Sequence, residues 1–290
     1  MNRIEELKEY QIEEIKKLAK DKRIALGFTE EPPIANHLNT ILDKLEIILV
    51  KMPIEGNNSK PSLSAIILNS KEGGENLVFI GVNSADYYDK QLFAISHELY
   101  HYFIQDEHPT NRAQLVEAKA NYFAAEFLLP ETTLKRKIFD EFKSHSLKDI
   151  DIRVLLRFIA RMHCTWWLPY RSLVKRLWEI EVINENQYQE FYNIDERNLE
   201  GEYGKIGMAT TSDIFLKLNT MTNTVSSSPI VIETIIRNFE DNLIDEESFI
   251  KLLGLFNKNP ADYGYDISVL QEDLNEIDKL IEGWADESWW

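Results

Sequence analysis

The pentapeptide His97-Glu98-Leu99-Tyr100-His101 constrains this chain more than any other stretch of its sequence. It lies within residues 93–103, FAISHELYHYF, whose apolar spacing predicts a helix that is buried over much of its surface. Residues four apart share a helix face, so His97 and His101 can direct two imidazoles at one ion. Buried ring nitrogens need partners, and a metal ion would supply one. The alternative is a chance pentapeptide with two partly exposed histidines.

The chemistry of zinc suits this pentapeptide. Zinc accepts imidazole nitrogen readily, and a catalytic site combines three protein ligands with one open position. Glu98 is one step round the helix from His97. It is therefore better placed to reach a metal-bound water, as a general base, than to coordinate the metal itself.

A third ligand is expected on the following helix, within residues 117–130, EAKANYFAAEFLLP. Glu117 and Asn121 are four apart and share a face, so Glu117 can bind the metal while Asn121 orients a ligand. Glu126 is a rival ligand, but it lies about two and a half turns further on and faces another way. His108 is a weaker candidate beside a proline. The alternative for Glu117 is an ordinary solvated carboxylate.

Hydrophobic periodicity predicts an α+β fold, in which a small mixed sheet of three or more strands is embedded among helices. The expected strands are residues 46–52, 62–69 and 76–83, the last two joined by a Gly-Gly hairpin turn. Asn111 and Gln114 suit a capping box for the helix that should end before Pro130. Residues 199–212 contain several glycines and suggest a linker. The helices are expected at 4–22, 30–45, 84–105, 112–129, 150–162, 167–180, 229–243, 245–256 and 266–284.

Length and charge limit the remaining possibilities. The 290 residues suggest a catalytic domain at 1–140, a helix-turn-helix-like extension at 141–200 and an acidic helical domain at 201–290. The net charge of −17 argues against a protein that coats nucleic acid. A charged N-terminus, the lack of a long apolar run and a single cysteine predict a cytoplasmic protein without membrane contact.

Two blocks of the sequence together resemble the ImmA/IrrE family of metallo-endopeptidases. The first block is residues 96–103, SHELYHYF, and the strand ahead of it, which ends at Asn83, is similar too. The resemblance covers roughly residues 30–180, and the paired motifs are far more specific than HExxH alone. The second block carries the pattern ExxANxFAAExLxP, here Glu117, Ala120, Asn121, Phe123, Ala124, Ala125, Glu126, Leu128 and Pro130.

The resemblance implies zincin-like active-site helices with zinc held by His97, His101 and Glu117 and with Glu98 as general base. It also implies a regulatory endopeptidase that cleaves a helix-turn-helix transcriptional repressor, often encoded alongside, and so derepresses phage, mobile-element, defence or stress-response genes. Tyr100 stands where the family usually has glycine. The alternative function is a regulatory protein that binds a repressor without cutting it, with structural zinc.

Several further residues are candidates for supporting roles. Tyr170 and His163 are candidate oxyanion stabilisers, although each is more often a packed or surface residue. Cys164 could cap the open position of zinc and keep the enzyme latent; a buried thiol is the alternative. An edge strand of the predicted hairpin could hold an extended substrate by strand addition.

A basic stripe on one predicted helix stands out in this acidic chain. Arg153, Arg157 and Arg161 are spaced four apart, and they could contact a nucleic-acid or small-molecule activator. The alternative, which we favour, is a face that pairs with the acidic C-terminal part. From residue 231 onwards that part holds 15 Asp and Glu against 4 Lys and Arg.

Overall fold

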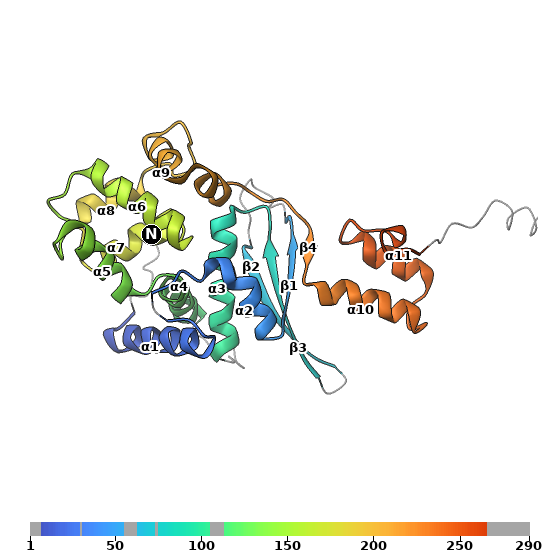
Figure 1. Ribbon diagram of the computed structural model, residues 1–290. Helices are drawn as coiled ribbons and strands as arrows, with labels where there is room; N and C mark the ends of the chain where they lie inside the picture. The colour runs from blue at the N-terminus through green and yellow to red at the C-terminus, as the bar shows by residue number, and fades with distance from the viewer. Residues whose placement is uncertain (1–6, 30, 55–62, 73–74, 105–112, 266–290) are drawn as a thin grey trace, which may run out of the picture. The chain divides into compact units, whose positions relative to one another are not determined.

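The computed structural model describes residues 7–29, 31–54, 63–72, 75–104 and 113–265 (Figure 1). These residues form eleven α-helices and a four-stranded mixed sheet, which confirms the predicted α+β class. The chain divides into two compact units, Met1–Ser226 and Ser227–Trp290. The expected domain limits at residues 140 and 200 both fall inside the first unit and stay a prediction. No helix of the described ranges is long and apolar enough to cross a bilayer.

The sheet forms where alternating apolar residues predict strands. Its order is β2-β3-β1-β4, with β2 and β3 antiparallel and β1 and β3 parallel. Alternate residues of β1 and β3, namely Ile47, Leu49, Val78, Ile80 and Val82, are buried. One face of the sheet therefore belongs to the core. The strand bounds are β1 Ile47–Met52, β2 Ala65–Glu72, β3 Glu75–Asn83 and β4 Ser226–Ser227.

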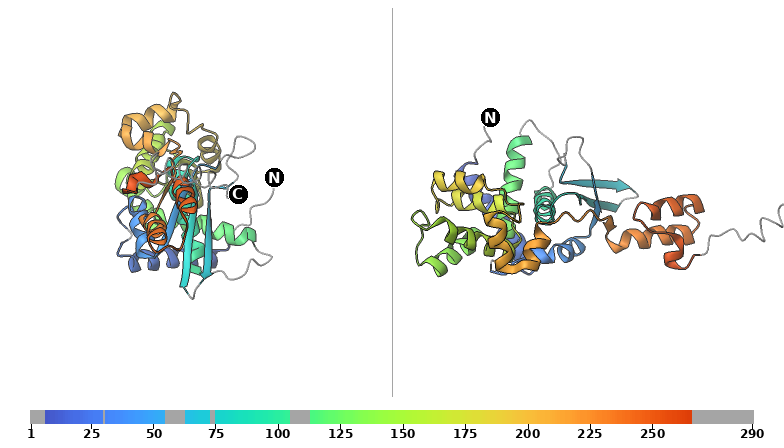
Figure 2. Two further views of the ribbon diagram at one scale, coloured as in Figure 1. Left: turned by 90° about the vertical axis from the view of Figure 1, so that its right-hand side faces the viewer. Right: turned by 90° about the horizontal axis from the view of Figure 1, so that it is seen from above.

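The helices that surround the expected site follow the predicted order. Helix α2 packs on β1, and α3 packs on β2 and β3; Figure 2 (right) shows α3 nearly end-on beside the strands. Helix α4 packs between α3 and α1 and ends ahead of Pro130, as expected. The predicted cap at Asn111 lies outside the described residues. The bounds are α1 Glu9–Ala25, the 3-10 turn η1 Ala35–His37, α2 Leu38–Lys44, α3 Tyr88–Ile104 and α4 Ala113–Leu128.

The remaining helices of the first unit extend its core. Apolar residues recur at helical spacing in α6 and α7, which both bury one face. Trp167 ends α6 in the left-handed conformation, with φ of 55°, and Pro169 starts the next helix. The bounds are α5 Glu131–Phe142, α6 Ile152–Trp166, α7 Tyr170–Glu179, α8 Glu185–Tyr192 and α9 Glu202–Leu218.

The predicted linker at residues 199–212 is wrong, because most of it lies in α9. This helix kinks at Thr211, where φ is −155° and ψ is 87°. Past the kink, the chain folds back so that the ring of Phe215 lies where a Cβ on Gly207 would be. A Cβ on Gly204 would meet the backbone of Leu199 in the same way. These glycines permit close packing, and sequence alone cannot separate that use from a flexible connection.

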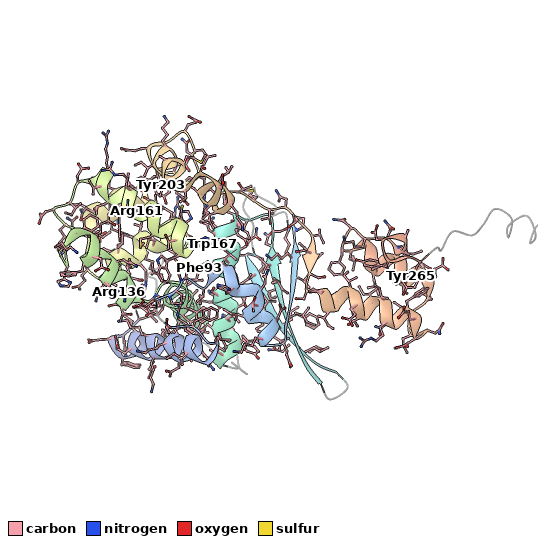
Figure 3. The ribbon with its side chains drawn as sticks, in the orientation of Figure 1. Phe93, Arg136, Arg161, Trp167, Tyr203 and Tyr265 are labelled. Atoms are coloured by element: carbon pink, nitrogen blue, oxygen red, sulfur yellow. The ribbon has the colours of Figure 1, made fainter. Side chains whose placement is uncertain are left out.

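The second unit is a small helical hairpin. It comprises α10 Pro229–Glu240, α11 Glu246–Gly254 and the 3-10 turn η2 Pro260–Tyr263. Phe239 and Phe249 stack with centroids 4.2 Å apart, and Tyr265, labelled in Figure 3, packs edge-on against both. Both predicted helices of the described part are confirmed. The helix expected at 266–284 and the terminal tryptophans lie outside the described residues.

The packing of α9 predicts the effect of adding one methyl group. Gly207→Ala should reduce the free energy of unfolding by about 1–3 kcal/mol, because the new Cβ overlaps the Phe215 ring inside the core. Gly254→Ala is the matched control: it is also helical, and no atom lies within 4 Å of its added Cβ. Urea denaturation of both variants measures the difference. Equal stability of the two variants would contradict the tight packing at the kink.

Candidate metal centre

Two helices bring the three expected ligands together. His97 and His101 lie on α3, and Glu117 lies on α4, which packs alongside. The two Nε2 atoms are 3.3 Å apart. Glu117 places Oε2 at 3.1 Å from Nε2 of His97 and Oε1 at 3.6 Å from Nε2 of His101. Among the described residues, this is the group of three His, Cys, Asp or Glu side chains whose ligand atoms could hold a metal ion.

Asn121 fixes the orientation of one of these rings. Its Oδ1 lies 3.0 Å from Nδ1 of His97. Because a carbonyl oxygen only accepts, Nδ1 donates the hydrogen bond to Asn121, which leaves Nε2 of the same ring facing Glu117 and His101. Lone pairs and a carboxylate that converge in this way repel each other unless a cation or a proton lies between them.

Glu98 lies beside the triad and is nearly buried. Its side chain belongs to the buried part of α3, while Glu117 remains exposed. Burial raises the pKa of the Glu98 carboxyl; the charge of His97 opposes the rise, and that of Glu117 adds to it. The backbone of Ile67, on the edge strand β2, hydrogen bonds to Glu98 and also opposes the rise. The general-base candidate thus belongs to the same helix as the two histidines and reaches the edge of the sheet.

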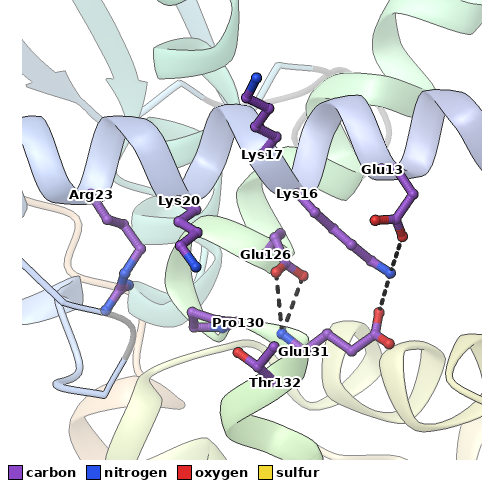
Figure 4. A pocket seen from close by; sticks show the side chains of 9 residues that line it. All are labelled: Glu13, Lys16, Lys17, Lys20, Arg23, Glu126, Pro130, Glu131 and Thr132. Atoms are coloured by element: carbon purple, nitrogen blue, oxygen red, sulfur yellow. Dashed lines mark hydrogen bonds and ion pairs between the residues drawn. The ribbon is translucent and has the colours of Figure 1, made fainter.

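Glu126, the rival ligand, is committed elsewhere. It forms an ion pair with Arg176 of α7 and accepts hydrogen bonds from the backbone N–H of Glu131 at 3.2 and 3.3 Å. Figure 4 shows it beside a surface pocket of about 320 Å³ between α1 and the start of α5. In that pocket, Lys16 bridges Glu13 and Glu131 at 2.9 and 2.8 Å. The triad residues do not line this pocket, so the structure separates Glu126 from the metal centre.

Tyr170 and Cys164 are candidates for supporting roles, but among the described residues their side chains have partners other than the triad. The Tyr170 hydroxyl is fully buried and donates to the backbone carbonyl of Phe191 at 2.9 Å. Cys164 is also buried, and burial raises the pKa of its thiol, while a hydrogen bond with Thr211 lowers it. Side chains buried in this way cannot meet a substrate or cap the triad, so the structure supports the alternative of ordinary core residues. His108 lies outside the described residues.

His163 contacts the first turn of α3, the helix that carries His97 and His101, instead of reaching the triad. It is fully buried, with Nε2 at 3.2 Å from Oδ2 of Asp89 and Nδ1 at 3.0 Å from the hydroxyl of Tyr203. Arg197 binds both Asp89 oxygens at 3.0 Å. Burial raises the pKa of Asp89, but the hydrogen bonds and charges of His163 and Arg197 outweigh it and lower the pKa overall. The sequence carries no signal for this cluster, because Asp89 and Arg197 are 108 residues apart.

Two of the three arginines of the basic stripe on α6 are paired within the first unit. Arg153 binds Glu202 of α9 at 2.9 Å, and Arg161 binds Glu141 of α5. The acidic partners thus come from neighbouring helices, whereas the expectation placed them in the C-terminal part. For Arg153 and Arg161, a face of ordinary surface ion pairs accounts for the spacing of the arginines.

The sequence of this region was compared with models of known protein families. Residues 68–160 match the model of Peptidase_M78, the IrrE N-terminal-like domain. This segment is therefore similar to the domain of a peptidase family. The resemblance predicted from the motifs is confirmed, and the matched segment contains His97, His101 and Glu117 together with Glu98. No curated protein matches the chain.

Loss of the Asn121 side chain should weaken metal binding without unfolding the helix. In Asn121→Ala, the His97 ring is free to rotate, and metal affinity should fall about 10–100-fold. Lys119→Ala, on the same helix but on another face than Glu117 and Asn121, is the control and should bind as the parent does. Competition with a chromophoric chelator measures both affinities. An unchanged affinity in Asn121→Ala would show that the amide does not position the ring.

Removing the charge of Glu126 should separate stability from metal binding. Glu126→Gln leaves the buried guanidinium of Arg176 without its carboxylate, so the free energy of unfolding should fall by about 3–5 kcal/mol. Metal content of the folded variant should equal that of the parent, because Glu126 is not at the triad. Denaturation and elemental analysis give the two values. A variant that loses its metal while it remains folded would restore Glu126 as a ligand.

Proposed function

We propose that this chain is a zinc-dependent endopeptidase of the ImmA/IrrE type. The observation that carries the proposal is the convergence of His97, His101 and Glu117 beside Glu98 within a segment of an IrrE-like peptidase family. A peptidase family implies a protein substrate. The finer points, zinc and a repressor as substrate, rest on ligand chemistry and on the family resemblance.

The distances among the ligand atoms support zinc. With metal–ligand bonds of about 2.0–2.1 Å, tetrahedral geometry places two ligand atoms about 3.3 Å apart. The three separations found here are 3.1, 3.3 and 3.6 Å. Two imidazoles and one carboxylate are also the ligand set of a catalytic zinc site. A structural zinc would take four protein ligands, and the described residues bring three together, which favours the peptidase over the alternative of a non-cleaving binding protein.

Each residue of the site has a chemical role in peptide hydrolysis. Bound zinc would lower the pKa of a coordinated water and polarise the scissile carbonyl. His97, His101 and Glu117 would hold the ion, and Asn121 keeps His97 in the required tautomer. Glu98 would take the proton of the attacking water on its carboxylate and carry it to the leaving amine.

The sheet edge and a hollow next to the triad suit an extended peptide. Strand β2 is the outer strand on its side of the sheet, and its Ile67 backbone hydrogen bonds to Glu98. A peptide that adds to this edge would pass the general base. Phe93, Asn121 and Ser172 line a hollow of about 160 Å³, which could take one substrate side chain. Because Asn121 contacts His97, this hollow borders the metal ligands.

The family resemblance proposes the substrate, a helix-turn-helix transcriptional repressor encoded beside the chain. Cleavage would release genes of a phage, a mobile element, a defence system or a stress response. Peptidases of this type can require an activating signal, so generic protein substrates are a poor test. The co-encoded repressor, purified separately, is the substrate to use.

The central test compares Glu98→Gln with His101→Ala. Glu98→Gln should keep about one zinc per chain but lose cleavage by about 100-fold or more, because the base is gone and the ligands remain. His101→Ala should lose both zinc and cleavage. Elemental analysis and gel electrophoresis of the repressor measure the two properties. Lys119→Ala is the control for both, because it lies two residues from Glu117 and from Asn121 and so on another face of α4.

The result can also favour the alternative function. A parent that binds zinc and the repressor but cleaves it no faster than Glu98→Gln would be a binding protein. If the parent binds no zinc even after zinc is supplied, His97 and His101 are two histidines on one helix face without a metal. That result would contradict the peptidase proposal.

A further inference from the structure

Two lysines meet over aromatic rings at the end of the sheet that lies near the start of α3. Lys217, near the end of α9, places Nζ 5.0 Å from the ring centroid of Tyr88 and 4.8 Å from that of Trp167. Lys51 of β1 places Nζ 5.8 Å from the same Tyr88 ring. The two rings lie 6.0 Å apart. Figure 3 labels Trp167 beside α3.

The direction of Lys51 is unusual for a charged residue. It continues the alternation of Ile47 and Leu49, whose side chains are buried on the helix-covered face of the sheet. Its ammonium group therefore points inwards, where burial and the charge of Lys217 both lower its pKa. A protein with a net charge of −17 has many carboxylates that could neutralise such a pair.

Within the described ranges of the chain, no acidic side chain neutralises Lys51 or Lys217. Neither lysine forms an ion pair there, whereas Lys90, which also lies over a tyrosine ring, has Asp86 at 3.5 Å. In the same part of the chain, the Tyr88 hydroxyl and the Trp167 indole N–H also have no hydrogen-bond partner. The cluster thus offers two cations and two further donors, the phenol O–H and the indole N–H, and none of its four side chains is a carboxylate.

The cluster lies at the carboxyl ends of two parallel strands. Strands β1 and β3 run parallel and end at Met52 and Asn83. The backbone N–H of Tyr88 donates to the carbonyl of Thr220 at 3.0 Å, which fixes α3 to the segment after α9. The carboxyl ends of parallel strands are a common place for anionic ligands.

We propose that Lys51, Lys217, Tyr88 and Trp167 form a binding site for a phosphate group. Two ammonium groups suit a doubly charged tetrahedral oxyanion, and the phenol and indole can donate to its remaining oxygens. The ligand would link β1, α3, α6 and α9. This site uses none of the proposed metal ligands, and it does not depend on peptidase activity.

Calorimetric titration with inorganic phosphate tests the site, on EDTA-treated protein so that metal-bound phosphate does not contribute. Sodium chloride at equal ionic strength corrects for screening. Lys217→Met should weaken phosphate binding about tenfold, and Lys51→Met/Lys217→Met should weaken it further. Lys90→Met removes the same charge from a lysine that has its own carboxylate and should bind as the parent does.

Two comparisons decide the outcome. Tighter binding of AMP than of phosphate would identify a phosphate ester as the ligand, while equal or weaker binding of AMP would identify the free ion. No phosphate or AMP binding by the parent overturns the proposal. Equal affinity in the parent and in Lys217→Met, with both folded by circular dichroism, also overturns it, because the exposed Lys217 can be replaced without disturbing the core.

Discussion

The packing of α3 against α4 is the contact on which the site depends. His97 and His101 belong to one helix and Glu117 to the other, so the triad exists only while the two helices keep their register. Aromatic rings hold that register: Tyr100 packs against Phe123 with centroids 5.5 Å apart. The Tyr100 side chain is buried and also lies edge-on to the ring of His101, with centroids 5.8 Å apart. Such contacts between aromatic rings add to the stabilisation that apolar burial gives the interface of α3 and α4.

Buried ion pairs hold both helices from outside the site. Asp89, in the first turn of α3, binds Arg197 and His163, while Glu126 of α4 binds Arg176 of α7. Burial of charge has a large desolvation cost, and apolar residues of similar size would often stabilise a fold more. Directional ion pairs do, however, admit few alternative arrangements of the helices that carry them. The helical part after residue 140 thus supports the metal centre without supplying any residue of the triad.

Charge is distributed unevenly among the described residues of the first unit. Basic side chains such as Lys16, Arg153 and Arg161 have carboxylate partners on nearby helices. Lys51 and Lys217 differ, because aromatic rings rather than acids surround them. This difference in partners separates the ordinary surface ion pairs from the proposed phosphate site.

The sequence by itself determined the parts of this protein that depend on local spacing. The i and i+4 positions of His97 and His101, the alternation within the strands and the turn between them predict helices, strands and ligand pairs, because each depends on neighbours a few residues away. The second motif likewise indicated Glu117 and Asn121. Only the tertiary structure decided whether α4 would turn Glu117 towards α3, and whether residues 199–212 were flexible or tightly packed. It also decided the partners of Asp89 and His163 and the meeting of Lys51 with Lys217, because these contacts join segments far apart in the chain, where no local pattern records which side chains will meet.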